Sequence, residues 1–141
     1  MTTPVRDRRA MIAGMDPWLR PGEWVFCAAA APEAAALLPV ALASFREDEG
    51  VSLVLPRSEA LRAGFDDAQV MACITLRVHS ALDGVGLTAG VAGALADAGI
   101  PCNMIAAFHH DHAFVPLADA ERALHLLRRL AALAARGEAA T

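Results

Sequence analysis

Two apolar runs of this sequence are separated by the polar stretch HSALDGVGLTA, residues 79–89. The run before it, residues 70–78, predicts a long and largely buried strand. In the run after it, apolar residues recur at helical spacing from Leu87 to Ala98, and Gly99 follows, which predicts a helix that ends there. The stretch is therefore a strand-to-helix loop, and its glycines and polar side chains indicate that this loop contacts a ligand.

The sequence after this helix predicts a hairpin and a final helix. Residues 101–108 and 113–116 predict strands, and the polar residues 109–112 predict the turn between them. Residues 119–136 predict a strong amphipathic helix. From residue 70 the order is strand, helix, strand, strand, helix, which is a ferredoxin-like plait without its last strand.

The first half of the chain predicts the same order of elements. A strand from residue 24 and a short helix over residues 32–38 precede a hairpin, whose strands cover residues 40–46 and 51–55 on either side of an acidic turn. A short helix from residue 57 follows. Two complete plaits would need more strands than this pattern supplies, so the halves share a sheet or a partner molecule extends it.

The same pattern predicts how the chain is divided. Residues 1–22 form a lead-in with a short helix that packs on the core, residues 23–68 form an N-terminal half, and residues 69–141 form a C-terminal domain. The boundary between the two halves is a short polar linker that begins with Gly64.

Composition excludes several classes of protein. The chain has 141 residues, of which 56% are hydrophobic and 20% are charged, so it is long enough and apolar enough to fold. Its formal net charge is -4 and it contains no Lys, which argues against a nucleic-acid partner. Prolines and a charge interrupt its most apolar window, residues 25–45, so we expect no transmembrane helix and no membrane partner.

Two further features predict a cytoplasmic protein. The N-terminal arginines are followed by Gly14, Asp16 and Pro17 rather than by the apolar core of a signal peptide. The three cysteines, at positions 27, 73 and 102, are odd in number and have no CxxC spacing, which is typical of reduced thiols in a core.

The loop of residues 79–89 has the chemistry to bind a small charged ligand. A loop that enters a helix presents free backbone amides and the positive end of the helix dipole, so it can hold a carboxylate without a basic side chain. Gly84 and Gly86 let the backbone come close to a ligand, Thr88 can cap the helix or donate a hydrogen bond, and Asp83 or Asp111 can receive an ammonium group. Ordinary turn and capping geometry is the alternative explanation for the glycines and Thr88.

The histidine cluster at residues 109–112 offers a second chemistry. His110 and His112 share a face if the segment is extended, and they can then chelate a divalent ion such as Zn²⁺. A tight site needs further ligands, and His79 is the obvious distant candidate. The alternative is a hydrogen-bonded turn without a metal.

No pattern in the sequence predicts an enzyme. Ser80 follows His79 without a nucleophile elbow or an orienting carboxylate, and Cys102 has no activating neighbour. Neither a Walker-type phosphate loop nor a GxGxxG fingerprint occurs. We therefore expect a protein without catalytic activity and without a cofactor.

Three segments carry a resemblance to a known family, namely residues 45–50, residues 79–88, and residues 102–106 leading into 110–112. They resemble the ACT domain, the small-molecule-sensing module of aspartate kinases and other enzymes of amino-acid metabolism. The similarity is greatest to small stand-alone bacterial members with two ACT-like halves. It implies an α+β fold, a ferredoxin-like βαββαβ plait with two ACT-like halves packed together, although the C-terminus does not visibly supply the fourth strand.

The resemblance also implies where a ligand binds. ACT domains typically bind an amino acid between the first strand-to-helix loop of one unit and the second strand of a neighbour. Carried over to this sequence, the ligand-binding residues are Ser80, Asp83, Gly84, Val85, Gly86, Leu87, Thr88, Asn103, Met104 and Ile105. For Asn103, a contact with a ligand and a bond to the backbone remain equally open.

The sequence therefore predicts an amino-acid-binding, allosteric regulatory module. We expect a homodimer in the cytoplasm, with a partner enzyme as the target of its regulation. Two alternatives remain open, namely a metal-dependent enzyme centred on His110 and His112, and a structural partner subunit.

Overall fold

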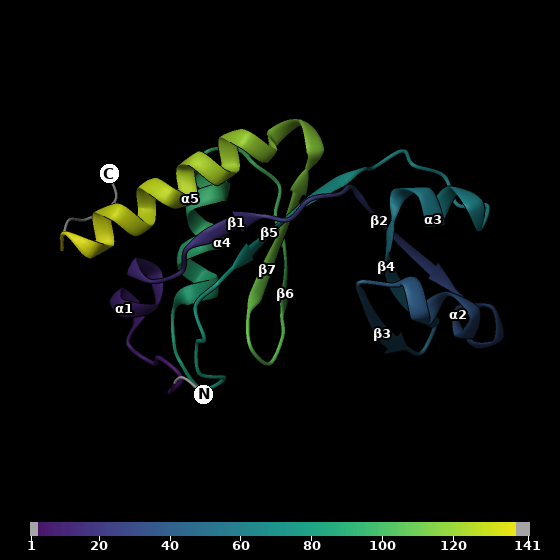
Figure 1. Ribbon diagram of the computed structural model, residues 1–141, viewed down its shortest axis with the longest axis horizontal. Coiled ribbons are helices and arrows are strands. Elements are labelled where there is room, and N and C mark those ends of the chain that lie inside the picture. Colours follow the sequence, from purple (N-terminus) through teal and green to yellow (C-terminus); the bar gives the residue numbers. More distant parts are fainter. Residues whose placement is uncertain (1–2, 138–141) are drawn as a thin grey trace. The chain divides into compact units, whose positions relative to one another are not determined.

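The computed structural model describes residues 3–137 (Figure 1). Its elements in chain order are α1 (Arg8–Ala13), β1 (Pro17–Leu19), β2 (Trp24–Ala29), α2 (Ala31–Leu37), η1 (Leu38–Val40), β3 (Ala43–Glu47), β4 (Gly50–Pro56), α3 (Arg57–Arg62), β5 (Met71–Leu76), α4 (Leu87–Asp97), β6 (Asn103–Ala106), β7 (Asp111–Pro116), η2 (Leu117–Asp119) and α5 (Ala120–Ala135), where η denotes a 3-10 helix.

The chain divides into two compact units. Unit 1 combines the N-terminal residues up to Arg20 with the residues from Ala72 onward, and unit 2 is the segment Pro21–Met71 between them. In sequence, unit 2 is thus inserted into unit 1. The domain division expected from the sequence, at residues 22 and 68, stays a prediction.

Unit 2 contains an antiparallel sheet in the order β3-β4-β2. The hairpin of β3 and β4 closes where Glu47 pairs with Gly50. Helices α2 and α3 contribute Ala34 and Ala60 to a small core that contains Val25 from β2 and Leu53 from β4. This packing is typical of a plait, in which one face of the sheet is covered by helices.

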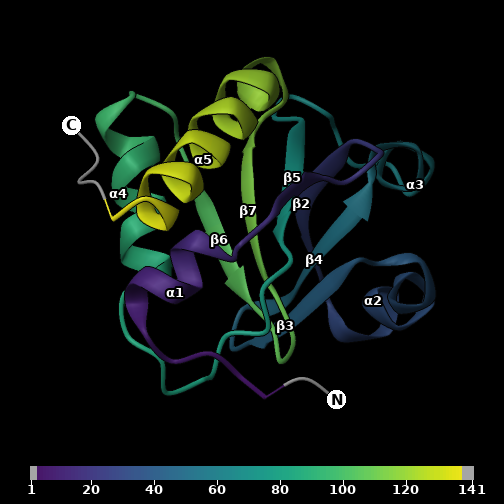
Figure 2. The ribbon, with the colours of Figure 1, turned by 60° about the vertical axis from the view of Figure 1, so that its left-hand side comes forward.

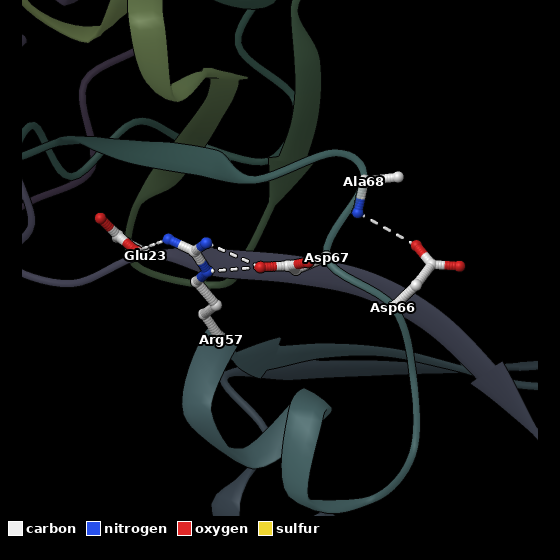
Figure 3. Close-up of polar contacts among 5 residues, drawn as sticks. All are labelled: Glu23, Arg57, Asp66, Asp67 and Ala68. Atoms are coloured by element: carbon white, nitrogen blue, oxygen red, sulfur yellow. Dashed lines mark hydrogen bonds and ion pairs between the residues drawn. The ribbon is translucent and has the colours of Figure 1, made fainter.

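An arginine joins three segments of unit 2 (Figure 3). Arg57, at the start of α3, donates from Nη1 to Glu23 Oε2 at 2.8 Å and from Nη2 to Asp67 Oδ2 at 2.7 Å. Hydrogen bonds from Arg57 to these two carboxylates raise its pKa, so the guanidinium stays charged. Close by, the amide of Ala68 donates to Asp66 Oδ1 at 3.0 Å, so the segment after α3 has a defined conformation.

Unit 1 contains the strands β1, β5, β7 and β6 in that order. The antiparallel pair of β1 and β5 aligns Pro17 with Leu76 and Leu19 with Ile74. The hairpin of β6 and β7 aligns Ala106 with Asp111.

Strand β1 corrects the prediction of an incomplete plait. The sequence pattern leaves the plait from residue 70 without a fourth strand, whereas the structure places β1 at the vacant edge beside β5. This strand precedes the rest of the plait in sequence. It has three residues and begins with a proline, so it is too short to produce an alternating pattern.

The core of unit 1 lies between its sheet and the helices α1, α4 and α5 (Figure 2). Alternate side chains of β5 and β7 point toward these helices because successive strand residues face opposite sides. The buried residues of this core are Met11, Ile12, Met15, Ala72, Ile74, Leu76, Val78, Leu87, Val91, Leu95, Ile100, Ala113, Val115, Ala120, Ala123, Leu124, Leu127 and Ala131. The expected packing of the N-terminal helix on the core is confirmed.

Several predicted strand boundaries were wrong, two of them with consequences for the fold and the site. The strand predicted from residue 40 begins at Ala43, and Leu38–Val40 is a 3-10 helix, because Pro39 fixes a helical backbone angle and has no amide for a ladder. Strand β7 begins at Asp111, so the hairpin turn covers residues 107–110 rather than 109–112. Unit 2, and unit 1 from β5 onward, nevertheless have the order strand, helix, strand, strand, helix, which confirms the α+β ferredoxin-like fold.

Replacement of a core leucine should test the packing of unit 1. Leu127 of α5 is fully buried, so Leu127→Ala should lower the free energy of unfolding by about 3 kcal/mol, from lost burial and the cavity left behind. Leu117→Ala is the control, because Leu117 is 37% exposed and should lose less than about 1 kcal/mol. Urea denaturation measures both, and equal losses would contradict this account of the core.

Candidate functional site

The loop between β5 and α4 is held by the N-terminal segment. Val5 forms a parallel bridge with Ser80. Its amide donates to the carbonyl of His79 at 2.8 Å, and the amide of Ala81 donates to the carbonyl of Val5 at 2.8 Å. The loop therefore has a fixed backbone on one side before it reaches the helix.

Helix α4 begins without a capping side chain. Its N-cap is Gly86, which has a φ of 107°, a left-handed conformation that glycine adopts at little cost. The first helical hydrogen bond runs from the amide of Gly90 to the carbonyl of Gly86, at 2.9 Å. The first turn thus presents the positive end of the helix dipole without a side chain that neutralises it.

Three glycines of this region lie against helix α1. An added Cβ would lie 3.0 Å from the Sδ of Met11 at Gly84, 2.6 Å from the Cδ of Arg8 at Gly86, and 3.0 Å from the Cδ1 of Ile12 at Gly90. The sequence interpretation gives Gly84 and Gly86 the role of admitting a ligand. In the structure, side chains of α1 occupy the space that a larger residue would need.

A cavity of about 500 Å³ lies beside the loop. This volume is in the range of small-molecule sites. Its lining residues are Met11, Ser80, Ala81, Leu82, Gly84, Val85, Gly86, Leu87, Thr88, Ala89, Ala92, Ala106, Ala107 and Asp111. The wall is mostly apolar, and polar groups are confined to the ends of the loop, the first turn of α4 and one carboxyl.

The structure brings only some of the predicted ligand-binding residues to this cavity. The lining residues among them are Ser80, Gly84, Val85, Gly86, Leu87 and Thr88. Asp83 is on the same loop but outside the lining, and its carboxylate pairs with Arg6 at 3.1 Å.

The predicted second wall, Asn103, Met104 and Ile105, lies outside this cavity, and its role in a site shared with a neighbouring unit stays a prediction. Asn103 is exposed on β6, Met104 packs against the core of unit 1, and Ile105 pairs with His112. None of them lines the cavity, whereas Ala106 and Ala107, directly after them, do.

Asp111 is the buried charged group of the cavity. It is 8% exposed, and within residues 3–137 its carboxyl makes no hydrogen bond or ion pair. Because Ala113 and Val115 of the same strand belong to the core, alternation places Asp111 on the apolar face of the sheet. Desolvation raises the pKa of Asp111, and the nearby charge of His110 lowers it by less.

His110 and His112 contact different partners. Nδ1 of His112 lies 3.0 Å from Oγ1 of Thr75, and Nδ1 of His110 lies 3.4 Å from the carbonyl of Val78. Burial and the charges of Arg20 and His110 lower the pKa of His112, which favours a neutral ring. In the described part of the chain, no group of three or more His, Cys, Asp or Glu side chains is arranged to hold a metal ion.

A smaller cleft of about 300 Å³ shares Ser80, Ala81 and Leu82 with this cavity. Its lining includes Arg6, Asp83, His79 and Phe108. The ring of His79 lies 5.5 Å from that of His109 and 6.4 Å from that of Phe108, measured between centroids. The carboxylate of Asp83 already pairs with Arg6, so this cleft attracts a cationic ligand less strongly than the cavity of Asp111 does.

The cysteines have no feature of catalytic thiols. All three are free, and desolvation raises the pKa of Cys27, Cys73 and Cys102. A raised pKa disfavours the thiolate, which is the nucleophilic form.

Sequence reasoning missed the contribution of α1 to the cavity. Met11 lines the cavity and Arg8 covers Gly86, although both lie far from the loop in sequence. Their spacing of three residues places them on one face of a helix, which is a usable signal once the helix is known to pack on the core.

None of the helices in the described range is both long and apolar enough to cross a membrane.

Two family models of the ACT domain match the sequence, one over residues 3–72 and one over residues 70–129. No curated protein matches it.

Solved structures are similar to the whole fold. A Vibrio cholerae protein of unknown function, described as a possible transport protein, has 40% sequence identity and a TM-score of 0.77 over 87% of this chain and 94% of its own. A protein from Agrobacterium tumefaciens has 20% identity and a TM-score of 0.62 over 82% and 87%. The regulatory subunit of aspartate kinase from Thermus flavus has 11% identity and a TM-score of 0.60 over 81% and 95%. These last two similarities concern the fold alone.

Removal of the charge of Asp111 should stabilise the ligand-free protein. Because the folded state raises the pKa of Asp111 above its ordinary value of 3.8, that state binds the proton more tightly, and its stability falls as the pH rises from 3.8 through the folded pKa. Asp111→Asn removes this loss and should raise the free energy of unfolding by about 1 kcal/mol at pH 7.

Urea denaturation of both proteins from pH 4 to pH 7 measures this effect. The advantage of the variant should grow with pH, and other titrating groups cancel in the comparison. A variant less stable than the parent at pH 7 would show that the carboxylate is stabilising.

Proposed function

The chain belongs to the ACT-domain family and carries two ACT halves, and on this premise we propose that it is a regulatory module that binds an α-amino acid in the cavity of unit 1. ACT domains are regulatory modules for small ligands. The amino acid, the partner enzyme and the cytoplasmic location are parts of the proposal. Three free cysteines are consistent with a reducing compartment.

The observation that carries this proposal is the buried carboxyl of Asp111. A carboxylate in apolar surroundings without a partner is costly, and an ammonium group is the natural partner for it. The open first turn of α4 lines the same cavity and favours a negative group. An α-amino acid carries both groups on one carbon atom, and the apolar lining suits an aliphatic side chain.

The described residues favour binding over catalysis. The histidines of β7 and its turn contact separate partners, and the thiol pKa values are raised. We therefore propose a module without catalytic activity, which acts by changing a partner enzyme when its ligand binds. A ligand can do so only if it binds one conformation better than another.

Thermal-shift measurements with each of the twenty L-amino acids test this proposal. At millimolar concentration, the correct ligand should stabilise the protein by about RT ln(1 + [L]/Kd). Asp111→Asn should abolish the shift although it leaves the cavity intact, and Asp83→Asn, whose carboxylate pairs with Arg6 outside the lining, should retain it. The absence of any shift with all twenty would refute amino-acid binding.

We also propose that the chain is a homodimer whose interface includes the loop beside this cavity and the neighbouring hairpin turn. Leu82 and Val85 on the loop are 75% and 80% exposed, and Phe108 on the hairpin turn is 68% exposed. Exposed large apolar side chains beside a site are typical of an interaction surface. A second copy would cover them and shield the ligand from water.

A charge on the hairpin turn should weaken the dimer. Phe108→Asp should raise the dimer dissociation constant by about tenfold or more, because a carboxylate would be buried in an apolar contact. Phe45→Asp is the matched control, since Phe45 is 72% exposed on β3 of unit 2. Sedimentation equilibrium measures both, and a monomeric parent protein, or equal weakening by both changes, would refute the interface.

A further inference from the structure

Helices α4 and α5 of unit 1 leave an apolar groove between them. The two helices lie side by side (Figures 1 and 2), and Nη1 of Arg122, near the start of α5, donates to the carbonyl of Ala98, just after the end of α4, at 3.0 Å. The groove has a volume of about 280 Å³ and is lined by residues of these two helices alone. It is separate from the cavity of Asp111, with which it shares no lining residue.

The α5 wall of the groove is a row of leucines. Leu126, Leu130 and Leu133 line it, and all three are partly exposed. Their spacing of four and three residues places them on one side of the helix, next to the face on which Ala123 and Leu127 are buried in the core. An apolar side of α5 is therefore left incompletely covered within unit 1.

The α4 wall of the groove consists mainly of small side chains. Ala94 and Ala98 line it, so large apolar side chains from outside can approach the helix closely. Small-molecule sites usually have volumes of about 300 to 1,000 Å³, and this groove is below that range. Side chains of a protein surface are therefore better occupants than a small ligand.

Each wall also carries one charge without a partner. Asp97 on α4 and Arg129 on α5 both line the groove, but within residues 3–137 neither side chain makes an ion pair or a hydrogen bond. Arg122 of the same helix, in contrast, pairs with Asp119 at 3.4 Å. The groove thus presents an unpaired negative charge on one wall and an unpaired positive charge on the other.

This arrangement is self-complementary. A contact across a two-fold axis uses the same surface of both copies, so each pair of residues in it forms twice. A second copy can place its Arg129 beside Asp97 of the first copy and its Asp97 beside Arg129, while the leucines of each α5 enter the groove of the other. Complementary charges of this kind determine the register of an interface.

We propose that the α4–α5 groove of unit 1 is an interface between two copies of this chain, in which Asp97 and Arg129 form reciprocal ion pairs. The contact uses none of the residues Leu82, Val85 and Phe108, so both proposed contacts can form at once and give an assembly larger than a dimer. The inference does not depend on amino-acid binding, because the groove lies outside the cavity of Asp111.

Sedimentation equilibrium of the full-length chain tests this interface. The parent protein should show two association steps, and Phe108→Asp should weaken one of them and leave a dimer that forms through the groove. Asp97→Arg or Arg129→Asp, added to Phe108→Asp, should each raise the dissociation constant of that dimer about tenfold or more, because each change replaces two attractive pairs by two repulsive ones. The double exchange should restore the constant to within about threefold, since the pairs form again with their signs exchanged.

Two control variants change the same charges outside the groove. Arg128→Asp is the control for Arg129→Asp, and Glu121→Arg is the control for Asp97→Arg. Both side chains are exposed on α5, and neither lines the groove. Both controls should keep the dissociation constant within about threefold of its value before the change, because exposed charges contribute little. Circular dichroism checks that each variant is folded.

Three results would refute this interface. The first is a Phe108→Asp protein that is monomeric, which would leave the groove to a different protein. The second is equal weakening by the groove changes and by their controls. The third is a double exchange that associates as weakly as the single changes. None of these results bears on amino-acid binding, which the thermal-shift measurements test separately.

Discussion

The packing of the N-terminal segment into unit 1 is the constraint on which the rest of that unit depends. β1 occupies the sheet edge beside β5, and Met11 and Met15 are fully buried in the core. These residues precede unit 2 in sequence, whereas the rest of their unit follows it. Unit 1 therefore cannot complete its sheet or its core until both ends of the chain have come together, which is a long-range requirement.

The same packing determines the form of the candidate site. Loop residues 79–81 bond to Val5, and the glycines at 84, 86 and 90 accommodate side chains of α1. A glycine-rich loop in a sequence is commonly taken as room for a ligand. Here the room is occupied by the protein itself, and the cavity lies on another side of the loop, with Met11 as part of its wall.

Local patterns were sufficient to predict most of the fold. Helices α4 and α5 have apolar positions at helical spacing, and β5 is a continuous apolar run, so their presence follows from short-range periodicity. β1 could not be predicted in this way, because three residues after a helix produce no pattern and only pairing with β5 defines them as a strand. The ACT resemblance also left the fourth strand unassigned.

The candidate site was predictable only in part, for a related reason. The loop is a local feature, and its sequence is sufficient to identify it. The contribution of the hairpin depends on its register, because a turn at residues 107–110 brings Ala106 and Ala107 to the cavity. The sequence names Asp111 as a possible acceptor of an ammonium group but places it in a turn at residues 109–112, whereas in the structure it is the first residue of a strand that continues through Ala113 and Val115. Asp111, Ala113 and Val115 occupy alternate positions of one strand, and this pattern would have placed Asp111 on the apolar face had the turn not been assigned to residues 109–112.

Two neighbouring residues of β7, Asp111 and His112, differ in which side of the sheet they face and in their hydrogen-bond partners. Nδ1 of His112 lies 3.0 Å from Oγ1 of Thr75, and burial lowers the pKa of its ring, whereas burial raises the pKa of Asp111 on the apolar face of the sheet. A fold selected for stability alone would replace such a carboxylate, because burying a charge without a partner is unfavourable. Local conflicts of this kind concentrate at functional sites. Binding at this site would also be coupled to the packing of the helices. A ligand that neutralises Asp111 would stabilise the conformation in which the loop, α4 and α1 are in contact. Since α1 also contacts α5 through Arg9, such a ligand would stabilise the whole helical layer of unit 1 rather than the loop alone.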